Sequence, residues 1–221
     1  MLQAVKILFI KEFKLELRRK SVISGIGLYL VSLIFICYIT FNLRNASISE
    51  ATWSALFWLV MLFCVINSAA KSFISESKGI SIYYYTIASP QAIIVSKILY
   101  NTVLCFALSF AGYVLFELFI DNRVEDQITF MLTLCLTSVG FASSLSLISG
   151  IAAKASNSNI LMAVLSFPLM ISILLMAIRI TKNVLDGLDP SVSHDELFNL
   201  VAINCILSGL AYLLFPYIWR S

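Results

Sequence analysis

The sequence predicts an all-α integral membrane protein with six transmembrane helices. Of its 221 residues, 60% are hydrophobic and 12% are charged, whereas soluble domains carry about 25% charged residues. The hydrophobic residues also gather into six runs of about 20 residues, the length that crosses about 30 Å of hydrocarbon. Because these runs take up most of the chain, we expect one polytopic membrane domain over residues 1–221 and no separate soluble domain.

The first segment, residues 1–20, predicts an amphipathic helix at the membrane interface. Apolar residues recur there at helical spacing, and a basic stripe lies opposite them: Leu2, Val5, Phe9 and Phe13 on one side, Lys11, Lys14 and Arg18 on the other. A basic amphipathic helix lies along an anionic leaflet. The alternative is a basic tail whose only role is to set the topology of the chain.

Six spans follow this helix, near residues 22–41, 53–70, 98–120, 128–152, 160–180 and 197–219. With the N-terminus inside, eleven of the fifteen lysines and arginines fall in inner segments, and nine of the twelve acidic residues fall in outer ones. Lysine and arginine are enriched on the cytoplasmic side of membrane proteins. We therefore expect both termini and the helix over residues 1–20 to be cytoplasmic.

The long polar interruption between the second and third spans, residues 71–90, predicts a short cytoplasmic coupling helix. A glycine ends one helix, and Ser89 and Pro90 start the next as N-cap and first helical residue. A short helix tied to spans at both ends can act as a lever for a soluble partner. The residues expected to make that contact are Glu76, Lys78, Gly79, Tyr83, Tyr84 and Pro90. The alternative is an interfacial anchor without a partner, because tyrosines suit the headgroup level.

The fourth span is rich in small and hydroxyl residues. Gly140 with Ser144, and Ser146 with Gly150, form two pairs of small residues four positions apart. Faces of this kind let helix backbones approach closely in lipid, so close helix packing is one interpretation. A polar lining of a transport path is the other.

The fifth span contains Pro168 in the sequence SFPLM. Proline removes a backbone donor and clashes with the preceding turn. Membrane helices tolerate this where neighbouring groups satisfy the freed carbonyls. Pro168 is therefore either a passive kink or a hinge.

Residues 181–196 form the longest predicted outer loop. Turns are marked by Asp186 with Gly187 and by Asp189 with Pro190. The loop also holds His194, the only histidine. A lone exposed histidine is usually a solvated residue, and contact with heme is the alternative because histidine is a common iron ligand.

Motifs of self-powered or catalytic proteins are missing from the sequence. It has no G-x-x-x-x-G-K-[ST] loop for ATP, no H-E-x-x-H zinc motif and no G-x-S-x-G nucleophile motif. Its five cysteines lie in the hydrophobic runs without a C-x-x-C pair. No ionisable residue lies at the middle of a predicted span, where ion-coupled carriers place such groups. We therefore expect no catalytic or metal site, and either a permease driven by a separate cytoplasmic ATPase or a scaffold.

Three stretches carry a resemblance to a known family: FKLELRRKS before the first span, ESKGISIYYYTIASPQAIIVSKIL after the second, and SFPLMISILL in the fifth. They are similar to the cytochrome c maturation permease family CcmB, also called heme exporter protein B, within the ABC-2 exporter class. That family has an acidic residue, a glycine and a proline at set spacing after the second span, and Glu76, Gly79 and Pro90 occupy this pattern here. Length, six-span layout and motif order match over essentially the whole chain.

The resemblance implies a permease subunit, not an enzyme, in the inner membrane of a bacterium. It further implies a separate ATPase, CcmA, which binds ATP, together with the membrane subunits CcmC and CcmD and, indirectly, the heme chaperone CcmE. Two permease copies per complex are expected, and no nucleic-acid partner. Heme is implied as a transported or handled substrate, with no cofactor bound directly.

Two other functions remain compatible with the residues. One is an ABC-2 permease for a lipid-linked glycan or a drug, which the neighbouring genes would distinguish from a cytochrome c maturation permease. The other is a membrane scaffold that transports nothing. Co-purification with an ATPase would separate the scaffold from both permeases.

Overall fold

The computed structural model describes residues 2–18, 20–42, 48–69, 88–120, 124–153 and 158–220. Over these ranges the regular secondary structure is α-helical apart from one 3₁₀ turn, and it contains no strand. The elements in chain order are α1 (Leu2–Arg18), α2 (Lys20–Asn42), α3 (Glu50–Ala69), α5 (Pro90–Phe119), α6 (Gln127–Ala152), α7 (Ser158–Leu185), the 3₁₀ turn η1 (Pro190–Ser193) and α8 (His194–Arg220).

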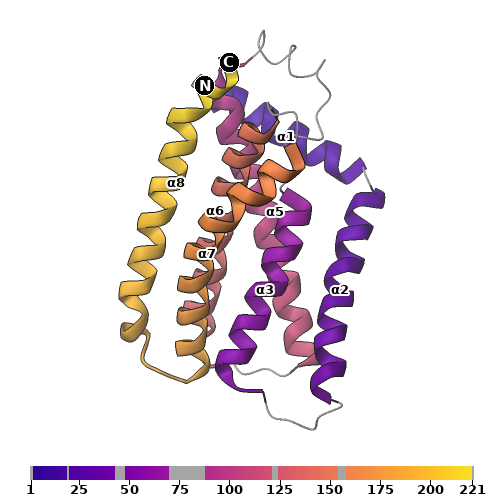
Figure 1. The fold of residues 1–221 in the computed structure, drawn as a ribbon, viewed down its shortest axis with the longest axis vertical. Helices are drawn as coiled ribbons and strands as arrows, with labels where there is room; N and C mark the ends of the chain where they lie inside the picture. The colour runs from indigo at the N-terminus through magenta and orange to yellow at the C-terminus, as the bar shows by residue number, and fades with distance from the viewer. Residues whose placement is uncertain are drawn as a thin grey trace.

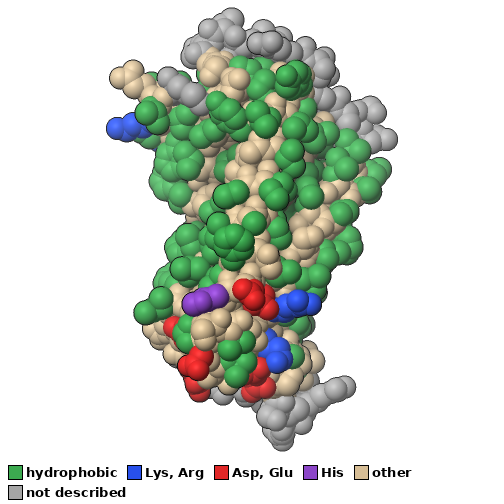
Figure 2. Space-filling model, turned by 90° about the vertical axis from the view of Figure 1, so that its left-hand side faces the viewer, with side chains coloured by type: hydrophobic (Ala, Val, Ile, Leu, Met, Phe, Trp, Pro, Cys, Tyr) green, Lys and Arg blue, Asp and Glu red, His purple; other side chains and the backbone are tan. Residues whose placement is uncertain are grey.

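Six helices are long and apolar enough to cross a membrane, namely α2, α3, α5, α6, α7 and α8. This confirms the predicted all-α class with six spans. The six helices form one bundle, and α1 lies across its upper end, where both chain termini are found (Figure 1). On the face seen in Figure 2, hydrophobic side chains cover the middle of the bundle, and most charged side chains gather toward the lower end.

The third span is longer than its predicted hydrophobic run. The run was expected near residues 98–120, whereas the apolar helix α5 extends from Pro90, the predicted restart, to Phe119. Ser96 and Lys97 precede that run, and both side chains are 1% exposed in the fold. Polar residues that are covered by neighbouring helices therefore extend this helix beyond its hydrophobic run.

The helix α6 is at the centre of the bundle. Of the membrane-spanning residues of α6, 72% are buried inside the protein, against 11% of those of α2. The helix α6 packs mainly on α5, α7 and α8. Three of its buried hydroxyls donate to backbone carbonyls one turn earlier in the same helix, over 2.7 to 2.8 Å: Thr133 to Thr129, Ser138 to Leu134, and Ser144 to Gly140. These bonds satisfy polar groups that would otherwise be costly to bury.

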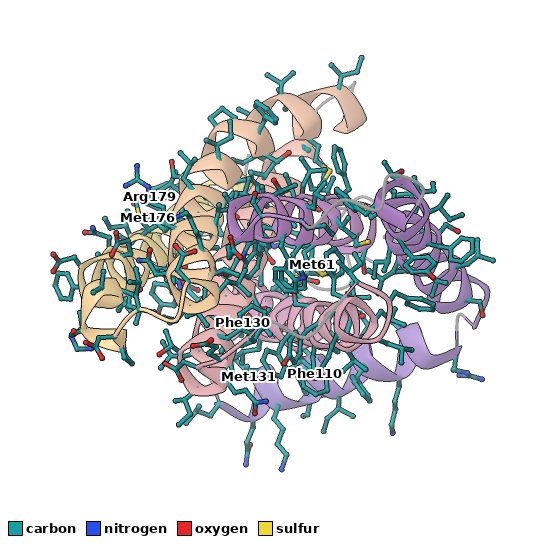
Figure 3. All side chains as sticks on the ribbon, turned by 90° about the horizontal axis from the view of Figure 1, so that it is seen from below. Met61, Phe110, Phe130, Met131, Met176 and Arg179 are labelled. Atoms are coloured by element: carbon teal, nitrogen blue, oxygen red, sulfur yellow. The ribbon has the colours of Figure 1, made fainter. Side chains whose placement is uncertain are left out.

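Buried aromatic side chains fill the space between α3, α5 and α6. Trp53 stacks on Phe57 with ring centroids 5.4 Å apart, and Phe57 meets Phe116 edge-on at 5.2 Å. Phe130 lies 5.7 Å from Phe57, and Figure 3 shows it inside the bundle together with Met61. Aromatic pairs at such distances add about 0.5–1.5 kcal/mol each beyond area burial, so this cluster holds α3 against α5 and α6.

A side-chain cap starts α6 at the lower end of the bundle. The Oδ1 of Asp126 accepts hydrogen bonds from the backbone N–H groups of Ile128 at 3.1 Å and Thr129 at 3.3 Å. A further hydrogen bond from the Thr129 side chain is the largest cause that lowers the pKa of Asp126, because it stabilises the ionised carboxylate.

The connection from α7 to α8 is shorter than predicted. Residues 181–185 belong to α7, which ends at Leu185. Lys182 pairs with Asp186 four residues later at 2.7 Å, and a pair at this spacing supports a helix end. The Oγ1 of Thr181 also accepts a hydrogen bond at 2.8 Å from the indole N–H of Trp58 in α3. The predicted turn at Gly187 is confirmed by its positive φ of 65°, a conformation that glycine adopts without strain.

Candidate coupling site

The predicted contact residues for an ATPase lie mostly outside the described residues: Glu76, Lys78, Gly79, Tyr83 and Tyr84. The sixth, Pro90, is the first residue of α5. Ser89 caps this helix, because its Oγ accepts a hydrogen bond from the Ala92 backbone N–H at 3.4 Å. The predicted helix restart is confirmed, and the coupling role of all six residues stays a prediction.

The two helices that flank residues 70–87 reach the same end of the bundle as α1. The helix α3 ends at Ala69 and α5 begins at Pro90, and both ends lie toward the top of Figure 1, where α1 crosses the bundle. The helices α1 and α5 also pack against each other. The start of α5 and α1 therefore lie at the same end of the bundle.

A buried ion pair joins α1 to α5. The Nζ of Lys97 lies 3.6 Å from the Oε1 of Glu12, and the two side chains are only 2% and 14% exposed. Lys11 also donates to the Glu12 Oε1 at 3.0 Å. A buried charge is costly unless an opposite charge accompanies it. Glu12 thus compensates the buried charge of Lys97, and the pair fixes α1 to α5.

This ion pair was not predicted from the sequence. Lys97 was counted only among the eleven basic residues of the inner segments. A signal was nevertheless present in α1, where Glu12 follows the buried Val5 and Leu8 at helical spacing. An acidic residue on the apolar side of a basic helix indicates a cation buried opposite it.

Polar contacts continue from α5 into the rest of the bundle. The Nδ2 of Asn101 donates to the Oγ of Ser146 at 2.8 Å, and both side chains are fully buried. On α6, Ser143 shares a hydrogen bond of 2.9 Å with Ser208 of α8. The helix that follows residues 70–87 is therefore joined by polar groups both to α1 and to the central helix α6.

A close approach of helices occurs at Gly140 of α6. A Cβ added there would lie 2.5 Å from the Oδ1 of Asn204 in α8 and 3.0 Å from the Cδ1 of Ile173 in α7. The Asn204 amide is held in place because its Nδ2 donates to the Leu136 carbonyl oxygen at 2.8 Å. The other small residues singled out in the sequence are buried in the same helix: Ser144, Ser146 and Gly150.

Comparison with known families decides what kind of protein carries this arrangement. The sequence model of the family described as CcmB protein matches residues 3–213, nearly the whole chain. The chain belongs to the CcmB family. Membership confirms the resemblance and implies a heme-exporter permease for cytochrome c maturation. Neither a curated protein nor a solved structure matches the chain.

In this CcmB-family chain, two further predicted residues lie on other helices. Pro168 is inside α7 with its side chain exposed, and α7 changes direction along its length in Figures 1 and 3; a proline within a helix is a physical reason for such a bend. His194 is exposed at the start of α8, at the lower end of the bundle (Figure 2). No three His, Cys, Asp or Glu side chains within the described ranges gather into a metal site.

Proposed function

We propose that this chain is the membrane permease subunit of an ABC transporter complex for cytochrome c biogenesis, driven by a separate cytoplasmic ATPase. The CcmB family match over residues 3–213 carries this proposal. The sequence has no phosphate-binding loop of the G-x-x-x-x-G-K-[ST] type. Energy from ATP must therefore enter through contact with another protein.

The partners follow from the family. The ATPase is CcmA-like, the neighbouring membrane subunits are CcmC-like and CcmD-like, and two permease copies form one complex. Heme is the handled substrate, delivered through the chaperone CcmE. The excess of lysine and arginine in segments on the N-terminal side supports cytoplasmic termini in a bacterial inner membrane.

The coupling contact lies in residues 71–90. A push from the ATPase reaches Pro90, from which α5 continues as one helix to Phe119. The ion pair between Glu12 and Lys97 makes α1 follow α5, and the Asn101 amide transmits the movement to α6. Coupling between distant sites is carried by such rigid helices and polar contacts.

Gly79→Val tests this proposal. A valine disfavours the left-handed conformation of a helix C′ position by roughly 1 kcal/mol or more, so the coupling helix should be misdirected while the spans stay folded. We expect normal abundance in the membrane and loss of both ATPase co-purification and cytochrome c yield. Glu76→Lys should have a smaller effect, because an exposed charge pair contributes only about 0–1 kcal/mol.

Gly209→Val is the matched control, because a Cβ at Gly209 meets no atom within 4 Å. This variant should keep abundance, ATPase binding and cytochrome c yield. Full ATPase binding and full yield in Gly79→Val would remove residues 71–90 from the coupling role and leave α1 as the next candidate. The chain could instead bind an ATPase while a strain that lacks the chain keeps a normal cytochrome c yield. That result would favour a permease for a glycan or a drug.

A further inference from the structure

A groove of about 360 Å³ lies between α1 and α5. Its lining is apolar except for one lysine: Leu2, Val5, Lys6 and Phe9 from α1, and Leu99 and Val103 from α5. An apolar slot that carries a single cation suits a ligand with a hydrocarbon part and an anionic group.

Lys6 does not belong to the basic stripe of α1. Successive residues of an α-helix are about 100° apart around the axis, which places Lys6 about 80° from Lys14, the nearest member of that stripe. Lys6 lies only about 40° from Leu2 and about 60° from Phe9 on the same count. Its positive charge is therefore on the flank of α1 that lines the groove.

The groove is continuous with the surface that faces lipid. Leu99 and Val103 are 47% and 45% exposed on a helix long enough to span the membrane. The helix α1 crosses the spans at the end of the bundle (Figure 1), which is the level at which headgroups meet hydrocarbon. A hydrocarbon chain can thus enter along α5 while a charged group stays beside α1.

We propose that this groove binds one acyl chain of an anionic phospholipid, whose phosphate pairs with Lys6. The positive charge of Lys6 complements the phosphate of the lipid. The other five lining side chains are apolar and complement the hydrocarbon of the acyl chain. Heme fits the lining less well, because none of the six residues is a histidine, cysteine, methionine or tyrosine that could ligate its iron. The groove and the ion pair of Glu12 and Lys97 lie between the same two helices, α1 and α5.

Native mass spectrometry of the full chain tests the proposal. The chain is reconstituted in equimolar phosphatidylglycerol and phosphatidylcholine, and the lipids retained after release are counted. Lys6→Gln should reduce retained phosphatidylglycerol about fivefold, the usual effect of one cation at a lipid surface, and leave phosphatidylcholine unchanged. Lys14→Gln removes the same charge from a part of α1 that does not line the groove, and it should retain phosphatidylglycerol as the unmodified chain does. Equal losses in both variants would overturn the proposal.

A second pair of variants tests the groove itself. Leu99→Trp fills the groove from α5 and should abolish lipid retention. Val114→Trp makes the same change at a similarly exposed position of α5, 45% against 47%, outside the groove lining, and should keep the lipid. Equal retention in these two variants would overturn the proposal, as would displacement of phosphatidylglycerol by hemin in the unmodified chain. Should Leu99→Trp not accumulate, the Lys6 and Lys14 pair decides alone.

Discussion

Removing the carboxylate of Glu12 should loosen the attachment of α1 to α5. Glu12→Gln leaves the Lys97 side chain buried at 2% exposure without the opposite charge 3.6 Å away. At this distance two unit charges attract by about 4–5 kcal/mol at an effective dielectric of about 20, and desolvation of both groups offsets part of that. We expect a loss of about 2–3 kcal/mol, below the upper range for buried pairs because Glu12 keeps 14% exposure.

A double-mutant cycle isolates the pair from its parts. Lys97→Met removes the charge and keeps an apolar chain, so Glu12→Gln combined with Lys97→Met should recover most of the stability lost by Glu12→Gln alone. The coupling energy should be about 1–3 kcal/mol. Lys11→Gln is the control, because Lys11 also contacts Glu12 but is 32% exposed, and its effect should stay below about 1 kcal/mol.

Thermal unfolding in detergent gives the free energy of unfolding of the unmodified chain, of Glu12→Gln, of Lys97→Met and of the double variant. Release of α1 is followed separately by the rate at which a cysteine at the buried Leu8 reacts with a water-soluble maleimide. That rate should rise with Glu12→Gln and return to its original value in the double variant. Coupling below about 0.5 kcal/mol, with Leu8→Cys equally protected in all four backgrounds, would refute the role of this pair in holding α1.

Three further outcomes are expected. Gly140→Ala should cost about 1–3 kcal/mol in thermal unfolding, because the new carbon would lie 2.5 Å from an amide oxygen of α8; Gly112→Ala should cost less, because its new carbon meets the flexible end of a methionine. Pro168→Ala should lower cytochrome c yield at unchanged abundance, and an unchanged yield would leave only a passive kink. A cysteine at the exposed Ser191 should react with an impermeant thiol reagent in intact cells and one at Ser77 should not; the reverse pattern would overturn the orientation.

The spans could be predicted because lipid imposes a simple rule on every helix that crosses it. Each helix must satisfy its own backbone and present about 20 mostly apolar residues, and this is visible in any single segment. The burial of Ser96 and Lys97 in α5 lies outside this rule, because these two side chains are covered by other parts of the protein. Hydropathy indicates which segments are apolar enough to lie in lipid. It does not indicate which polar residues will be buried by a neighbouring helix.

The site was predictable only where its contacts are local. The cap formed by Ser89 and the start at Pro90 depend on residues adjacent in the chain. The bond from Asn101 to Ser146 joins residues 45 positions apart, and it depends on which helices become neighbours. A single sequence shows the faces of each helix, and the pairing of those faces requires the fold.

The hydroxyl groups of α6 also bear on how the chain enters the membrane. This helix is made before α7 and α8, which later cover it, so its polar face must first meet hydrocarbon. Thr133, Ser138 and Ser144 bond to carbonyls of α6 itself, and these donors need no partner helix during insertion. Ser143, in contrast, shares its hydrogen bond with Ser208 of α8. Three hydroxyls of the most deeply buried span thus carry their hydrogen-bond partners with them into the membrane, whereas the Ser143 bond forms only when α8 is in place.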